Sequence, residues 1–167
     1  MHDIFVAVLM GSDSDLPTAQ GTIDVLDQFG IPCEVKITSA HRTPAATIAY
    51  VQDAEARGCA LFICAAGLAA HLAGAVASQT IRPVIGIPME SGPLNGLDAL
   101  FSTVQMPGGV PVACMAIGRA GARNAGYFAA EILALSRPEL AAQLRADREK
   151  SLAMVLAKDA DLRRGRG

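Results

Sequence analysis

The chain has 167 residues, of which 51% are hydrophobic and 18% charged, with a formal net charge of -2 at pH 7. This length suits one domain with a full core, and the small net charge gives no electrostatic reason to expect nucleic acid or an anionic membrane as a partner. No apolar run approaches the roughly 18 to 20 residues that span a bilayer. The apolar surplus predicts surface hidden in subunit interfaces.

The four cysteines are scattered, with no C-x-x-C pair and no neighbouring histidine cluster. They are typical of core thiols in a reducing compartment. The chain shows no basic segment before its first apolar run, so a signal peptide is not indicated. We therefore expect a cytoplasmic protein.

Apolar periodicity predicts strands that alternate with helices. In chain order it predicts a strand at residues 3–10, a helix at 16–29, a strand at 33–38, a helix at 45–57, a strand at 59–65, a helix at 69–80, a strand at 83–88, a helix at 96–104, a strand at 110–117 and a helix at 120–135. Such alternation indicates right-handed βαβ units and a parallel sheet covered on both faces. Five units fit an α/β, flavodoxin-like three-layer sandwich with strand order 2-1-3-4-5.

The end of the chain differs from this pattern. A further helix is predicted from Pro138, with Leu140, Leu144, Leu152 and Leu156 among charged residues and no strand after it. The helix could lie on its own domain or form an arm packed on a neighbouring subunit, and the pattern favours neither. We expect an α/β catalytic domain at residues 1–136, with residues 137–167 as a C-terminal helical arm and tail of the same domain.

In an open parallel sheet, ligands bind beyond the carboxyl ends of the strands where the strand order reverses. In the order 2-1-3 this point is surrounded by loop 1 (residues 11–15), loop 2 (residues 39–44) and loop 3 (residues 65–72). Loop 1 offers Ser12 and Ser14 to a phosphate at a helix N-terminus, whereas Asp15 suits ribose hydroxyls. Plain N-capping by Ser14 or Asp15 is the simpler interpretation of loop 1 alone.

Loop 2 reads S-A-H-R-T-P. Arg42 offers a planar fork to a phosphate, and Ser39 adds a hydroxyl. His41 can exchange a proton near neutral pH, which suits general acid/base catalysis. A lone histidine in a turn more often has a structural role. Because Ser39 and Arg42 flank His41, a structural and a catalytic role are equally compatible with the sequence.

Loop 3 places Gly67 and His71 in a stretch of small and apolar residues. The glycine would let the backbone approach a planar ligand closely. No acid lies near enough in sequence to complete a metal site, so we expect no metal. The glycine- and proline-rich stretches at residues 88–97 and 105–111 are either tight turns or walls of a site, and composition does not decide between them.

Five motifs together carry a family resemblance: V-L-M-G-S-D-S-D, S-A-H-R-T-P, A-G-L-A-A-H-L, L-N-G-L-D-A-L-F-S-T-V-Q-M-P-G-G-V-P-V and A-I-G-R-A-G-A-R-N-A. In order and spacing they resemble the class I N5-carboxyaminoimidazole ribonucleotide mutases of purine (IMP) biosynthesis. The resemblance covers residues 5–135.

The resemblance implies an isomerase that moves a carboxylate from the exocyclic nitrogen of an aminoimidazole ribonucleotide to ring carbon 4, with no cofactor, metal or ATP. It implies a homo-octamer and favours the arm for the last helix. His41 would be the general acid/base. The implied substrate-binding residues are Ser12, Ser14, Asp15, Ser39, Arg42, Gly67, Ala70, His71 and Leu72.

Three residues depart from the family pattern. Ala73 stands where a proline is usual, Glu90 where an uncharged residue is common, and Arg123 in a helix start where it is unusual. An inward Glu90 carboxylate would weaken the binding of an anionic substrate, so we expect it to point away from the site.

Two other functions are compatible with parts of the pattern. The class II relatives carboxylate aminoimidazole ribonucleotide directly with carbon dioxide, but they have lysine and glycine where this chain has Arg42 and Thr43. A non-catalytic flavodoxin-like binding module is the remote alternative. A receiver domain needs an acid at the end of its third strand, where this chain has Cys64, Ala65 and Ala66. A flavin module would usually offer more aromatic residues than the 4% present.

Overall fold

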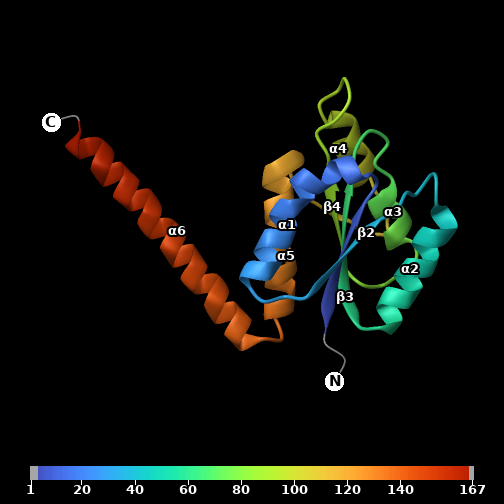
Figure 1. The fold of residues 1–167 in the computed structure, drawn as a ribbon, viewed down its shortest axis with the longest axis horizontal. Helices are drawn as coiled ribbons and strands as arrows, with labels where there is room; N and C mark the ends of the chain where they lie inside the picture. Colours follow the sequence, from blue (N-terminus) through green and yellow to red (C-terminus); the bar gives the residue numbers. More distant parts are fainter. Residues whose placement is uncertain (1–3, 166–167) are drawn as a thin grey trace. The chain divides into compact units, whose positions relative to one another are not determined.

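The computed structural model of the protein describes residues 4–165 and contains one parallel five-stranded sheet (Figure 1). Its strands are β1 (Phe5–Met10), β2 (Cys33–Ile37), β3 (Cys59–Ala66), β4 (Val84–Pro88) and β5 (Ala113–Cys114). They are arranged in the order β2-β1-β3-β4-β5, and every neighbouring pair is parallel. This arrangement confirms the predicted fold class and strand order.

The helices are the short 3-10 turn η1 (Asp13–Asp15), α1 (Leu16–Gln28), α2 (Pro44–Ala56), α3 (Leu72–Ala77), α4 (Leu97–Val104), α5 (Gly118–Ala134) and α6 (Pro138–Arg164). Figure 1 shows α1 and α5 on one side of the sheet and α2 and α3 on the other. Helices α1 and α5 are in contact, because the buried hydroxyl of Thr22 in α1 donates to the carbonyl oxygen of Ala122 in α5 at 2.6 Å.

The core lies on both faces of β1, because successive side chains of a strand point to opposite faces. Phe5, Ala7 and Leu9 belong to one buried cluster with Val51 of α2 and Val76 of α3. The alternate side chains of the strand are also at most 1% exposed and lie on the other face; they are Val6, Val8 and Met10. Burial on both faces explains why the strand is a continuous apolar run.

Two elements are shorter than predicted by several residues. The strand expected at residues 110–117 is reduced to Ala113–Cys114, which pairs only with Ile85 and Gly86 at the edge of the sheet. Pro111 has no N–H to donate to a strand ladder, so pairing cannot start earlier at that position. The helix expected at residues 69–80 covers only Leu72–Ala77, because residues 69–71 form a tight turn closed by a bond from His71 N to Ala69 O at 2.9 Å.

All four cysteines are free. Cys59 and Cys64 are buried, as predicted, whereas Cys33 and Cys114 are half-buried. Burial raises the pKa of Cys59 to about 11 and also raises the pKa of Cys64. These thiols therefore stay protonated and serve as apolar packing groups.

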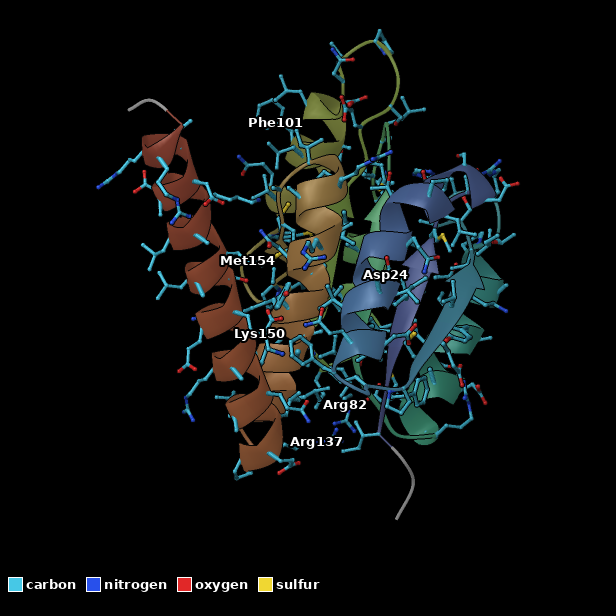
Figure 2. All side chains as sticks on the ribbon, turned by 60° about the vertical axis from the view of Figure 1, so that its left-hand side comes forward. Asp24, Arg82, Phe101, Arg137, Lys150 and Met154 are labelled. Atoms are coloured by element: carbon cyan, nitrogen blue, oxygen red, sulfur yellow. The ribbon has the colours of Figure 1, made fainter. Side chains whose placement is uncertain are left out.

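The chain divides into two compact units, one up to Ala129 and one from Ala130 onward. In the second unit, Pro138 occupies the first turn of α6, where its missing N–H costs nothing. The helix buries Leu140 and Leu144, but Leu152, Met154, Val155 and Leu156 are 57–65% exposed; Figure 2 shows Lys150 and Met154 on this helix. Within residues 4–165, no helix combines the length and apolar character needed to cross a membrane.

Candidate active site

The three loops at the predicted switch point surround one cavity of about 610 Å³. This volume lies in the range of small-molecule sites, which is about 300 to 1,000 Å³. The cavity is lined by Gly11, Ser12, Ser14, Asp15, Ser39, Ala40, His41, Arg42, Ala66, Gly67, Leu68, Ala69, His71, Leu72 and Ser91. Every predicted site residue except Ala70 is among them. Ala70 is instead buried, with 2% of its surface exposed.

Loop 1 leaves β1 at Met10 and turns at once into η1. Ser12 caps this turn, because its extended backbone lets the hydroxyl accept the N–H of Ser14 at 3.3 Å. The two serine hydroxyls lie 2.9 Å apart and are hydrogen-bonded to each other. The sequence suggested Ser14 or Asp15 as the cap, but Asp15 makes no side-chain cap bond to α1. Its carboxylate is therefore available to a ligand.

The Asp15 carboxyl faces the cavity from a partly desolvated position. Desolvation by burial raises its pKa above the ordinary value, and the negative charge of Asp13 adds to the rise. A hydrogen bond from the backbone of Ser12 acts in the opposite direction. A carboxylate that has lost part of its hydration gains more from new hydrogen-bond donors, such as ribose hydroxyls.

Loop 2 is held by its own hydroxyls. Ser39 accepts the N–H of Arg42 at 3.1 Å, and the N–H of Ser39 donates to the hydroxyl of Thr43 at 2.9 Å. The loop is anchored below by a buried hydrogen bond between Thr38 and Thr47 at 2.6 Å. These bonds close the turn and leave the side chains of His41 and Arg42 exposed at the cavity.

Arg42 connects the first two loops. Its Nη2 donates to the carbonyl oxygen of Gly11 at 3.1 Å. This bond uses one of the five N–H donors of a guanidinium. The positive charge of Arg42 therefore lies beside the hydroxyls of loop 1, and an anion bound there could contact the guanidinium and the hydroxyls together.

His41 and His71 form a hydrogen-bonded pair across the cavity. The Nε2 atom of His41 lies 2.8 Å from Nδ1 of His71, with ring centroids 4.9 Å apart and planes inclined by 75°. One of the two nitrogens must carry the hydrogen and the other must accept it. The sequence placed both residues in switch-point loops but could not predict this contact across 30 positions.

The wall formed by loop 3 is mostly backbone and apolar side chains. Leu68 adopts a left-handed backbone conformation with φ of 56°, and its side chain lies over Gly92. Ser91, in loop 4 (residues 89–96), also lines the cavity, and sequence reasoning did not single it out. The only sequence signal was the glycine- and proline-rich stretch at residues 88–97, for which a turn and a site wall were equally compatible.

None of the three departures from the family pattern is among the described residues that line the cavity. Ala73 is buried in α3, and Arg123 lies over the ring of Tyr127 at 5.4 Å from its centroid. The Glu90 carboxylate lies beside Gly118, where α5 begins, so it points away from the cavity as expected. Across residues 4–165, no three His, Cys, Asp or Glu side chains come together in a way that could hold a metal ion.

Comparison with known proteins decides the family. Residues 5–153 match the family described as AIR carboxylase. The chain belongs to this family. The match spans the sheet, the cavity and more than half of α6, so the resemblance carried by the five motifs is confirmed.

Similar proteins support a narrower assignment. N5-carboxyaminoimidazole ribonucleotide mutase of Thermotoga maritima is 51% identical over 153 residues, which cover 92% of this chain and 88% of that protein. The mutase of Mycobacterium leprae is 52% identical over 162 residues, covering 97% and 94%. The crystal structure of Treponema denticola PurE has a TM-score of 0.87 and 29% identity, covering 95% of this chain and 98% of that one.

Proposed function

We propose that the chain is an N5-carboxyaminoimidazole ribonucleotide mutase. It would isomerise the carbamate N5-carboxyaminoimidazole ribonucleotide to 4-carboxy-5-aminoimidazole ribonucleotide in purine biosynthesis. The observation that carries the proposal is the cavity with a histidine pair between a hydroxyl-rich wall and an apolar wall. The identity of about 50% to curated mutases over most of the chain supports it.

The hydroxyl-rich wall would bind the ribose phosphate. Arg42 provides a planar charged fork, and the hydroxyls of Ser12, Ser14 and Ser39 lie in the two loops that Arg42 connects. The Asp15 carboxylate would repel a phosphate, so it would accept hydrogen bonds from the ribose hydroxyls instead. This arrangement fixes the end of the substrate that does not react.

His41 would carry the proton of the reaction. When the bond between the exocyclic nitrogen and carbon dioxide breaks, the nitrogen needs a proton to become a free amine. Carbon 4 then attacks carbon dioxide and must lose its own hydrogen. One imidazole can give the first proton and take back the second, so the proton count is balanced at the end of the cycle.

His71 would orient His41 through their hydrogen bond, in which one ring nitrogen donates and the other accepts. The small and apolar residues of loop 3 would keep water out and retain carbon dioxide between the two steps. Gly67, Ala70 and Leu72 belong to this wall; Ala70 would contribute by packing behind the lining rather than by direct contact.

The alternative is direct carboxylation of aminoimidazole ribonucleotide, as in the class II relatives. The residues after His41 are arginine and threonine, whereas the class II relatives have lysine and glycine there. The deciding experiment supplies the purified protein with the carbamate in one reaction, and with aminoimidazole ribonucleotide and bicarbonate in another. We expect fast formation of the carbon-linked carboxylate only from the carbamate. Efficient turnover only with aminoimidazole ribonucleotide and bicarbonate would instead assign the protein as a carboxylase.

We also propose a cytoplasmic homo-octamer. Leu97, Phe101 and Val104 form an apolar stripe on α4 that is 46–56% exposed, and Figure 2 shows Phe101 on this helix. The apolar residues of α6 are similarly exposed, which favours an arm that packs on a neighbouring subunit. Truncation after Leu135 should give smaller assemblies in light scattering. An unchanged octamer would show that α6 does not contribute to the interface.

A further inference from the structure

The hydroxyl of Ser91 is buried without a hydrogen-bond partner, the one such side-chain atom found within residues 4–165. A buried hydroxyl normally finds a partner, because leaving it unpaired costs the full loss of its hydration. The same residue lines the cavity. An unpaired polar group at the wall of a ligand site therefore points to a partner that arrives with the ligand.

Gly67 creates the niche that holds this hydroxyl. A Cβ atom at Gly67 would lie 2.2 Å from Oγ of Ser91 and 3.3 Å from its Cβ, so the serine sits directly on the glycine backbone. Loop 4 is fixed there by the bond from Met89 N to Ala66 O at 2.9 Å. From the sequence, the absence of a side chain at Gly67 predicted a close approach by a planar ligand. The structure shows that Ser91 occupies that space.

Ser91 differs chemically from its surroundings. Among the described lining residues that follow β3 and β4, only His71 and Ser91 have polar side chains. A carboxylate brought against this wall would lose its water and meet mainly apolar groups. The Ser91 hydroxyl can rotate about one bond, so it is a suitable hydrogen-bond donor to one of the carboxylate oxygens.

We propose that Ser91 binds the migrating carboxylate. Its hydroxyl leaves the niche on Gly67 when the substrate enters, and donates a hydrogen bond to an oxygen of the carboxyl group beside the histidine pair. The bond holds that group while its attachment changes from nitrogen to carbon. This role rests on the proposed mutase function and adds a residue from loop 4 to the site.

The substitution Ser91→Ala tests the role because it removes the hydroxyl and keeps the Cβ atom. Turnover of the carbamate should fall about 10- to 100-fold, as expected for a lost hydrogen bond to a charged group. The dissociation constant of the carbon-linked carboxylate should rise by a similar factor. Aminoimidazole ribonucleotide, which lacks the carboxylate, should bind to the variant and the wild type with equal affinity. The melting temperature should stay the same or rise, because an unpaired buried group is removed.

Ser78→Ala is the matched control, since the Ser78 hydroxyl lies at the end of α3 and donates to Ala75 O at 2.8 Å. It should leave turnover and both affinities unchanged. Equal loss of affinity for both ribonucleotides in Ser91→Ala, with a lower melting temperature, would make Ser91 structural and overturn the proposal. Normal turnover of Ser91→Ala would overturn it as well. A wild-type protein that does not isomerise the carbamate would instead refute the proposed function itself.

Discussion

The two walls of the cavity are built in different ways. In loops 1 and 2, most polar side chains bond to neighbours within a few positions, as Ser12 does with Ser14 and Ser39 with Arg42, and the bond from Arg42 to Gly11 joins the two loops. In loops 3 and 4, the decisive contacts join residues far apart in sequence, such as Gly67 with Ser91. The first wall shapes itself locally, whereas the second takes its shape from packing.

The difference separates binding from chemistry. The locally built wall presents a charge and hydroxyls at fixed places, which suits recognition of a ribose phosphate. The packed wall excludes water, which suits the steps at the base. His41 belongs to the first wall and His71 to the second, so their 2.8 Å hydrogen bond joins the two. Substitutions on the two walls should therefore fail in different ways.

The largest effect is expected at the junction of the walls. His41→Asn removes the proton carrier and should lower turnover about 100- to 10,000-fold, the typical loss for a general acid/base. The variant should still bind the ribonucleotide, because loops 1 and 2 close without the imidazole. Single-turnover kinetics and calorimetric binding measure the two effects separately.

His71→Asn is the comparison for this experiment. It should cost less turnover than His41→Asn, since it removes only the partner that orients the ring. If His71→Asn abolished turnover and His41→Asn kept it near normal, the proton carrier would belong to the packed wall and our assignment would be wrong.

The sequence predicted the locally built wall well, because each signal lay within one short motif. Strand order and loop composition predicted that Ser12, Asp15, His41 and Arg42 lie near one another, and all four line the cavity. Ser91 was missed because its importance depends on Gly67, and no short-range pattern links two residues that belong to different βα loops. The burial of Ala70 could not be predicted for a related reason: which alanine in a run of small residues faces a cavity depends on the turn that precedes α3.

The fold shows the same limit. Buried strands such as β1 were recognisable as continuous apolar runs, since both faces are covered. The apolar run around β5 looked similar, yet only two residues pair, because the strand lies at the edge of the sheet beside Pro111. Periodicity indicates burial, but the length of a strand depends on its neighbours.

The second-largest effect should come from the packed wall. In Gly67→Ala, the new Cβ would lie 2.2 Å from the Ser91 hydroxyl and force it out of its niche. We expect turnover to fall about 10- to 100-fold, because the new Cβ would also lie 3.3 Å from the Cβ of Ser91 and would push the whole residue away, so that its hydroxyl no longer reaches the carboxylate. Ser91→Ala combined with Gly67→Ala should cost little more than either alone, which a double-mutant cycle of turnover measures.

Gly21→Ala is the matched control for this substitution. Its Cβ would meet the nearest atom, the backbone N of Arg123, at 3.7 Å, which is ordinary contact distance. The change should leave turnover unaltered and raise stability, because alanine is favoured over glycine inside a helix such as α1. Additive losses in the double-mutant cycle would contradict the shared action of Gly67 and Ser91.

A smaller effect is expected at the charge of the locally built wall. Arg42→Lys keeps the charge but loses the planar fork, so the apparent KM should rise about 10-fold while folding is preserved. Arg82→Lys, at an exposed ion pair with Glu55, is the matched control and should leave KM unchanged. An unaltered KM in Arg42→Lys would shift phosphate binding to loop 1 alone.

The smallest effect is a pH dependence that belongs to Asp15. Desolvation raises its pKa, so the carboxylate is protonated at a higher pH than an ordinary aspartate and then stops accepting ribose hydroxyls. At neutral pH, Asp15→Asn should raise KM roughly a few-fold, which is the effect of losing one weak hydrogen bond. The substrate phosphate titrates equally with both proteins. The ratio of the KM of Asp15→Asn to the KM of the wild type therefore reports the titration of Asp15 alone. That ratio should fall towards one as the pH is lowered.

The sign of the linked stability separates this loss of affinity from acid unfolding. Since the folded pKa lies above the unfolded one, the folded state binds more protons in the window between them, and Asp15 alone makes the fold more stable as the pH falls through that window. As the pH falls, wild-type protein should therefore lose affinity for the substrate while the Asp15 carboxyl adds to its stability. Thermal melting of the wild type and Asp15→Asn over the same pH range checks these opposite directions. A ratio of KM values that stays constant with pH would place the ribose away from Asp15.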